Sequence, residues 1–230
     1  MTSIPYRIAL IVGAGAGISA SVARALASAG LRVGLASRSP GKLSGYAAEI
    51  GAAAFAVDAS EPASVEQLFK DVDARLGEPD VVLYNASTRL RGPLVGLEPE
   101  EVRRSLAVSA FGGFLVVQQA ARRMIAHTGG AILITGASAS VKGFAQSSPF
   151  AMGKFALRGL AQSAARELGP QGIHVAHFLI DGSVRSATRP DSGDRTLDPD
   201  GIAQTYMDVL RQPRNAWSFE VDLRPWAESF

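Results

Sequence analysis

The chain has 230 residues, of which 47% are hydrophobic and 19% charged, a composition typical of a globular protein with a sizeable core. Its formal net charge of +2 is too small to indicate a nucleic acid or an anionic membrane surface as a partner. The absence of cysteine excludes disulfide bonds, thiolate metal sites and a cysteine nucleophile. The first apolar run, residues 8–12, is too short to span a bilayer and ends in glycines, so we expect a cytoplasmic protein.

Short apolar runs alternate with longer segments of helical periodicity, as in a parallel sheet covered by helices on both faces. We expect strands at residues 7–12, 32–36, 53–57, 81–84, 131–135, 173–180 and about 217–223. We expect helices at residues 19–29, 62–76, 99–126, 149–168 and 199–211. The pattern predicts one α/β domain over residues 1–230, a doubly wound Rossmann-type fold with a seven-stranded parallel sheet. Its nucleotide-binding half is expected at about 1–90, and its substrate and oligomerisation half at about 91–230.

A glycine-rich turn lies between the first expected strand and the first expected helix. It contains Gly13, Gly15 and Gly17 and is followed by Ile18. Glycines allow the backbone to approach a pyrophosphate closely, and the free amides at the start of the next helix face the anion. A tight strand–helix turn without a ligand is the alternative, but the strand before and the helix after favour nucleotide binding. The spacing differs from the common GxGxxG pattern, because Ile18 occupies the third glycine position.

Polar residues at the ends of the second and third expected strands indicate which nucleotide binds. An acidic residue after the second strand would accept hydrogen bonds from a ribose 2′-hydroxyl, whereas this chain has Ser37 and Arg38, which suit a 2′-phosphate. They predict NADP(H) as the preferred cofactor and NAD(H) as the second possibility; the alternative is a solvated surface arginine. Asp58 and Ala59 follow the third strand, where the carboxylate either accepts from the adenine amino group or caps the next helix.

The segment 181–198 is rich in Ser, Asp, Arg, Gly and Pro and is expected to form one long loop, either a lid or a mobile surface loop. Arg185 and Arg189 in this loop, and Arg89 and Arg91 after the fourth strand, could contact an anionic substrate, although solvated surface arginines are the favoured interpretation. The three histidines do not form a metal-ligand pattern, so no metal is expected.

Three further segments carry a family resemblance. Tyr84-Asn85-Ala86-Ser87 follows the fourth expected strand, Phe150-Ala151-Met152-Gly153-Lys154 begins a helix, and Asp181-Gly182-Ser183-Val184 follows the sixth strand. In order and spacing, together with the glycine turn, they resemble the Asn-Asn-Ala-Gly, Tyr-x-x-x-Lys and Pro-Gly segments of the short-chain dehydrogenase/reductase family. The resemblance runs from about residue 7 to residue 186 and implies a nicotinamide-dependent oxidoreductase. It implies that the cofactor-binding residues include Asn85, Ala86, Lys154, Gly182, Val184 and Ser186.

The chain departs from this family at its catalytic positions. The resemblance implies a tyrosine hydroxyl that exchanges a proton with the substrate, and a lysine one helical turn later that lowers the pKa of that hydroxyl and binds the nicotinamide ribose. Here Phe150 stands at the tyrosine position and Lys154 is retained. The family's catalytic serine aligns with Ala137, with Ser138 as its neighbour, and the family's helix asparagine aligns with Ser109. The remaining candidate proton donors are a water held by Lys154 and the hydroxyl groups of Ser138, Ser147 and Ser148.

Two functions stay open at this point. The first is an NADP(H)-dependent oxidoreductase for a small-molecule carbonyl, alcohol or activated double bond, in which Lys154 organises the nicotinamide and Ser138 binds the substrate oxygen. The second is a catalytically impaired NADP(H)-binding sensor or assembly partner, which Phe150 and Ala137 favour. The retained lysine and the long loop favour the enzyme. Helices 99–126 and 149–168 form subunit interfaces in the resembled family, which implies a homodimer or homotetramer.

Overall fold

The structure is a computed structural model and describes residues 4–191 and 193–227. Its centre is one seven-stranded sheet in which every pair of neighbouring strands is parallel, in the order β3-β2-β1-β4-β5-β6-β7. The strands are β1 (Ile8–Val12), β2 (Arg32–Ser37), β3 (Ala53–Ala56), β4 (Val81–Tyr84), β5 (Gly130–Thr135), β6 (Ile173–Ile180) and β7 (Glu220–Leu223). This arrangement confirms the expected doubly wound Rossmann-type fold.

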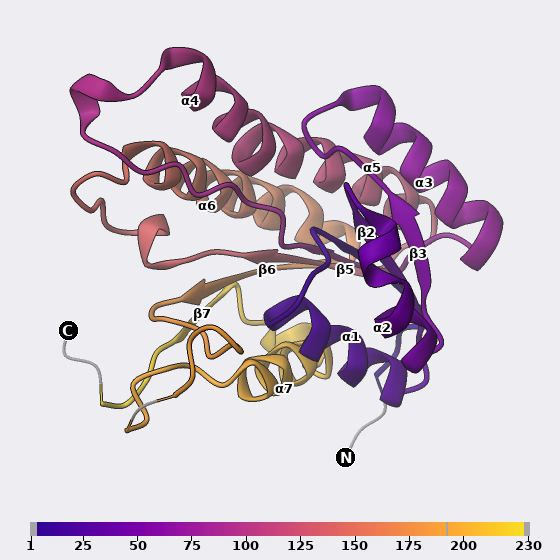
Figure 1. The fold of residues 1–230 in the computed structure, drawn as a ribbon. Coiled ribbons are helices and arrows are strands. Elements are labelled where there is room, and N and C mark those ends of the chain that lie inside the picture. Colours follow the sequence, from indigo (N-terminus) through magenta and orange to yellow (C-terminus); the bar gives the residue numbers. More distant parts are fainter. Residues whose placement is uncertain (1–3, 192, 228–230) are drawn as a thin grey trace.

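Helices cover both faces of the sheet (Figure 1). On one face lie α3 (Pro62–Leu76), α4 (Pro99–Leu106), α5 (Gly112–Ala126) and α6 (Ser148–Leu168). On the other lie α1 (Ile18–Ser28), α2 (Ser44–Glu49) and α7 (Pro199–Leu210). Every residue of β1, β4, β5 and β6 is buried, which explains why these strands are continuous apolar runs rather than alternating ones. Two hydrophobic cores result, one on each face of the sheet.

The expected helix 99–126 is wrong as a single regular helix. A π-helical turn at Ala107–Phe111 separates α4 from α5. At this turn the Tyr84 hydroxyl, at the end of β4, donates a hydrogen bond to the carbonyl of Val108. A side chain that bonds a helix carbonyl diverts it from the regular ladder, and hydrophobic periodicity does not reveal a one-residue insertion of this kind.

Two smaller differences concern short elements. Helix α2 has no counterpart among the expected elements, and β7 begins at Glu220 rather than near residue 217. Residues 214–219 instead form a short helical turn and an extended connection, in which Trp217 stacks on His174 with ring centroids 4.6 Å apart. Trp217 is thus half-buried through a ring contact that precedes the strand.

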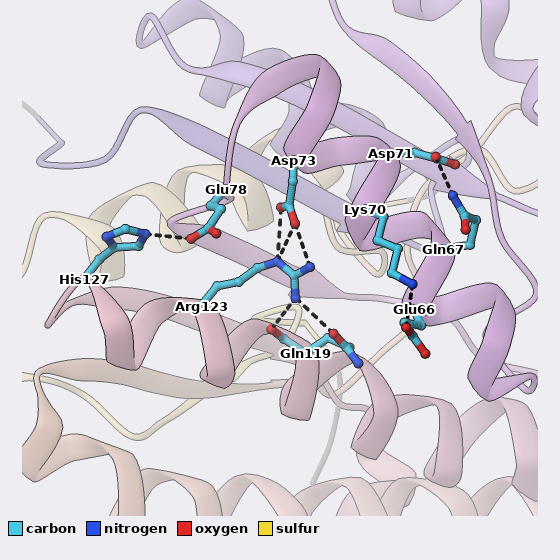
Figure 2. A network of polar contacts seen from close by, with 9 residues as sticks. All are labelled: Glu66, Gln67, Lys70, Asp71, Asp73, Glu78, Gln119, Arg123 and His127. Carbon is cyan, nitrogen blue, oxygen red and sulfur yellow. Dashed lines mark hydrogen bonds and ion pairs between the residues drawn. The ribbon is translucent and has the colours of Figure 1, made fainter.

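A polar network ties α3 to α5 (Figure 2). Arg123 of α5 contacts both carboxylate oxygens of Asp73 of α3, the shortest distance being 2.6 Å from Nη2, and also bonds Gln119. Beside it, His127 Nε2 lies 2.6 Å from Glu78. The two-pronged Arg123–Asp73 contact is partly buried, which makes it a stronger restraint than an exposed ion pair. It fixes α3 against α5 on one face of the sheet.

Candidate functional site

The carboxyl ends of β1, β4, β5 and β6 meet at one edge of the sheet, where the sequence motifs lie. The strand order reverses at β1, which pairs with β2 on one side and with β4 on the other. In doubly wound sheets, ligands bind in the crevice at such a reversal point. The motifs that are far apart in the sequence are therefore neighbours in space.

The turn after β1 lies directly against the segment after β4. A Cβ atom on Gly13 would stand 2.3 Å from the backbone nitrogen of Ala86, and the φ angle of Gly13 is +86°. The Asn85 side-chain amide donates a hydrogen bond of 3.2 Å to the carbonyl of Gly13. Only glycine meets both demands, the close approach and the positive φ. Asn85 and Ala86 thus help to shape the glycine turn.

Gly15 and Gly17 border open space instead. A Cβ atom on either would have no neighbour within 4 Å, and Gly17 has a φ angle of +88°. Helix α1 begins at Ile18, and the Ser19 hydroxyl bonds the carbonyl of Gly15 at 3.0 Å. The amides of the first helical turn have no partner within the helix, so they are free to bind an anion. The turn therefore fits a pyrophosphate.

A cavity of about 210 Å³ lies next to this turn, and Ser37, Arg38, Asp58 and Ala59 all line it together with Asn85 and Ala86. The Arg38 side chain is exposed. One oxygen of Asp58 accepts hydrogen bonds from the backbone nitrogen and the hydroxyl of Ser60, at 3.0 and 2.6 Å, and these bonds lower the pKa of the carboxyl group. Asp58 thus closes a turn with Ser60 and does not cap α3, whose N-cap residue is Glu61, and its second oxygen has no such bond in the described residues.

Lys154 is the most deeply buried charged group of the site, with 3% of its surface exposed. Its Nζ donates a 2.8 Å hydrogen bond to the carbonyl of Thr135 at the end of β5. Burial, and then the charge of Arg89, lower its pKa from 10.5 to about 8. Phe150 precedes it by one turn of α6, and Nζ lies 5.8 Å from the centroid of the Phe150 ring.

Lys154 and Phe150 face a cavity of about 340 Å³. Predicted cofactor residues from three loops share its lining, namely Ile18, Asn85, Gly182 and Val184. Ser186 lies apart from them and lines a neighbouring cavity with Gly15 and Gly17. The structure thus brings four of the predicted cofactor residues together around Lys154 and distributes the others over the two adjoining cavities, and their roles stay predictions.

The candidate positions for a catalytic hydroxyl differ in whether they line the cavity beside Lys154. Ala137, which has no hydroxyl, lines the cavity beside Lys154, whereas Ser138 is not among the described lining residues. The same is true of Ser147 and Ser148. Ser109 is fully buried in the π-helical turn, where its hydroxyl accepts from the backbone nitrogen of Thr88 at 3.2 Å. The assignment of Ser138 to the substrate oxygen stays a prediction without a lining contact to support it.

Several site groups lacked a clear sequence signal. Arg89 lines the cavity and its guanidinium carbon lies 4.9 Å from the centroid of the Phe150 ring. Behind the site, His177 is fully buried and its Nδ1 lies 2.9 Å from Glu220, which Arg158 also contacts. Burial lowers the pKa of His177. The sequence indicated Arg89 only as a possible contact for an anion, and it assigned no role to His177, because loop arginines and lone strand histidines are common; their neighbours in space place both at the site.

Within residues 4–191 and 193–227, no helix has the length and apolar character needed to cross a membrane. The same residues contain no group of three or more His, Asp or Glu side chains placed to hold a metal ion.

Comparisons with known proteins agree with this geometry. Residues 7–192 match the family model described as short chain dehydrogenase. An uncharacterised oxidoreductase of Staphylococcus aureus is 27% identical over 98% of this chain and 100% of its own length. Among solved structures, a short-chain dehydrogenase from Rhodopseudomonas palustris is 32% identical with a TM-score of 0.84, covering 96% of this chain and 99% of its own. A metagenomic short-chain oxidoreductase in complex with NADP is 29% identical with a TM-score of 0.86, covering 99% and 100%.

Proposed function

Because the chain belongs to the short-chain dehydrogenase family, we propose that it is an NADP(H)-dependent oxidoreductase that acts on a carbonyl, an alcohol or an activated double bond. The observation that carries this proposal is the buried Lys154, which faces a cavity shared with residues of the glycine-turn, β4 and β6 loops. A buried ammonium group costs free energy, so its presence in an open cavity indicates a functional role.

The described residues fit the cofactor. The open space at Gly15 and Gly17 accommodates a pyrophosphate beside the first turn of α1. Arg38 lines the adjacent cavity, where its guanidinium suits the 2′-phosphate that distinguishes NADP(H) from NAD(H). NAD(H) is the second possibility. When bound, the nicotinamide supplies or accepts the hydride equivalent that interconverts carbonyl and alcohol.

A proton must also reach the carbonyl oxygen, and Lys154 is placed to donate it. An ammonium group has three hydrogens, and one of them is used in the bond to Thr135. With a pKa of about 8, the group is protonated at neutral pH but gives up a proton more readily than an ordinary lysine. Solvent then reprotonates the amine. This role replaces the hydroxyl that Phe150 lacks.

Fluorescence titrations with NADPH and NADH test the cofactor, and a screen of carbonyl and enone compounds for NADPH oxidation tests the activity. We expect tighter binding of NADPH, and we expect Arg38→Asp to reverse that preference. Tighter binding of NADH by the unaltered protein would contradict the assignment of Arg38.

A non-catalytic NADP(H) sensor or assembly partner is the second candidate. Phe150 and Ala137 favour it, because the two cavity-lining positions that correspond to the family's catalytic hydroxyls have none. Tight NADPH binding without oxidation of NADPH by any screened compound would support this function and overturn the enzyme.

We also propose that a second copy of this chain covers α5 and α6. Phe111 and Phe114 are exposed and stack with ring centroids 6.2 Å apart, and Phe155 of α6 is exposed as well. Apolar side chains gathered on packed helices are typical of subunit interfaces. Light scattering after size exclusion should give a dimer or tetramer, and Phe114→Glu should shift it towards a monomer. A monomeric unaltered protein would contradict the proposal.

A further inference from the structure

The cavity beside Lys154 gathers positive charge. Besides Lys154, it is lined by Arg89 from the loop after β4 and by Arg189 from the loop after β6. None of the described residues that line it is acidic. Its volume is about 340 Å³, and the proposed cofactor shares it, because predicted cofactor residues such as Asn85 and Gly182 also line it; the space left suits a small substrate. The lining therefore selects for a small ligand that carries negative charge.

Arg89 and Arg189 contact no carboxylate among the described residues, unlike many other arginines of the chain. Arg185, in the same loop as Arg189, lies 2.7 Å from Asp198. Arg158, on the same helix as Lys154, lies 2.7 Å from Glu220. In the loop after β6, Asp198 thus neutralises the charge of Arg185, whereas Arg189 stays available to a ligand.

The unneutralised charges act on one another. Partial burial, and then the charges of Arg91 and Arg189, lower the pKa of Arg89. The charge of Arg89 in turn adds to the lowering of the pKa of Lys154. Positive charges that face one another raise the free energy of the empty cavity, and a bound anion removes that cost.

Phe150 gives Arg89 a fixed position. The guanidinium carbon of Arg89 lies 4.9 Å from the centroid of the Phe150 ring, and Lys154 Nζ lies 5.8 Å from the same point. Cations are attracted to the face of an aromatic ring, and an arginine stacks on it through its flat guanidinium. The ring therefore acts as a platform that holds one cation while the donor edges of the guanidinium stay free.

We propose that the substrate of this site carries a carboxylate, which Arg89 and Arg189 bind while the reacting carbonyl lies towards Lys154. The inference rests on the proposed oxidoreductase function and adds the class of substrate. The planar fork of a guanidinium matches a carboxylate in two-pronged geometry, whereas the ammonium of Lys154 acts as a point donor to a single oxygen.

The test compares compounds that share a carbonyl and differ in charge: acetoacetate with methyl acetoacetate, and levulinate with methyl levulinate. At saturating NADPH we expect kcat/KM to be at least about tenfold higher for each acid than for its ester, because hydrogen bonds to charged groups are the strong ones. Arg89→Gln and Arg189→Gln should each bring this ratio towards one, chiefly by raising KM for the acid. An unaltered protein without preference for the acids would overturn the inference.

Arg195→Gln is the matched control. Arg195 is exposed in the same loop as Arg189 but is not among the described residues that line the cavity, so removing its charge should leave both activity and the acid-to-ester ratio unchanged. Arg89→Lys adds a second comparison, since it keeps the charge and loses the planar fork; its ratio should fall between those of the unaltered protein and Arg89→Gln.

A binding measurement separates this inference from the proposed function. Saturation-transfer NMR on protein loaded with NADP⁺ should detect acetoacetate, and Arg89→Gln should lose the signal while Arg195→Gln keeps it. If the NMR signal behaves in this way but no compound oxidises NADPH, the carboxylate-binding site is supported and the proposed oxidoreductase function is overturned. Equal turnover of acids and esters would sustain the oxidoreductase and overturn the anion site, and absence of both turnover and the NMR signal would overturn both.

Discussion

Phe150 and Lys154 stand one turn apart at the start of α6, with the ring and the ammonium close enough to touch the same small ligand. Phe150 has no hydroxyl that could donate a proton to the carbonyl oxygen, which leaves Lys154 as the acid with the lowest pKa on the cavity wall. In the proposed reaction, the Lys154 ammonium therefore donates the proton that a tyrosine hydroxyl would donate in other members of the family.

Restoring a hydroxyl at this position tests that view. Phe150→Tyr places a phenol beside Lys154, and a positioned general acid contributes about 10²- to 10⁴-fold in rate. We expect the rate of NADPH oxidation to rise by about 10²-fold, because the new hydroxyl adds to a relay that already works. Phe144→Tyr is the control, since Phe144 is exposed and is not among the described residues that line the cavity. A slower Phe150→Tyr variant would show that the native ring itself is needed.

The pKa of Lys154 predicts a pH dependence. The group must be protonated to act as an acid, so kcat/KM for carbonyl reduction should be constant below pH 8 and fall as the pH rises through about 8. The titratable groups that act on it are Arg89 and His177, and burial lowers the pKa of His177 below its ordinary value of 6.5, so His177 stays neutral in that range. Lys154→Arg should lower the rate and remove the fall. A fall that persists in this variant would assign it to another group.

At the scale of elements, the junction between α4 and α5 determines the shape of the site's wall. The π-helical turn at Ala107–Phe111 places Ser109 beneath Thr88, and Gly112 allows α5 to approach the end of β3 and β4. A Cβ atom on Gly112 would stand 2.5 Å from the carbonyl oxygen of Ala59 and 2.7 Å from the Tyr84 hydroxyl.

Gly112→Ala should therefore destabilise the fold by about 1–3 kcal/mol, the usual cost of overpacking, and should disturb the Tyr84–Val108 contact. Chemical denaturation measures the difference. Gly159→Ala is one control, with no neighbour within 4 Å of a new Cβ. Gly159 lies on the surface of α6 that the second copy is proposed to cover, so Gly45→Ala is added as a control away from it. Gly45 is exposed on α2 with no neighbour within 4 Å of a new Cβ, and this change should be neutral or stabilising by up to about 1 kcal/mol. Equal effects at Gly112 and Gly45 would contradict this account of the junction.

At the scale of the whole molecule, two buried histidines near the β6–β7 edge make the fold sensitive to acid. Burial is the main cause that lowers the pKa of His174 and of His177 below the ordinary value of 6.5. The unfolded chain binds these protons more readily, so stability is fully present above about pH 6.5 and declines as the pH falls below it.

Melting temperatures measured from pH 8 to pH 5 should show this decline. His174→Gln removes one of the two titrations and should make the decline shallower. His127→Gln is the control, because His127 is exposed. If the slope below pH 6.5 is the same in both variants, His174 does not contribute to it.

The sequence by itself determined the fold and the place of the cofactor motifs. Apolar runs, helical periodicity and the glycine turn are local properties. They predicted all seven strands, although β7 begins later than expected, and they predicted the motif residues that follow the strands. The identity of Phe150, Lys154 and Arg38 likewise needed no structure. The helix junction was missed because one inserted residue hardly changes hydrophobic periodicity.

Only the tertiary structure decided which of these residues meet. The strand order brings Asn85 against Gly13 and brings the loops after β4 and β6 to one cavity, so that Arg89 and Arg189 lie beside Phe150 and Lys154. It also set Ala137 rather than Ser138 on the cavity wall. The burial of a side chain and the neutralisation of its charge depend on neighbours that are distant in sequence. For this reason only the tertiary structure identifies Arg89 and Arg189 as a candidate anion site.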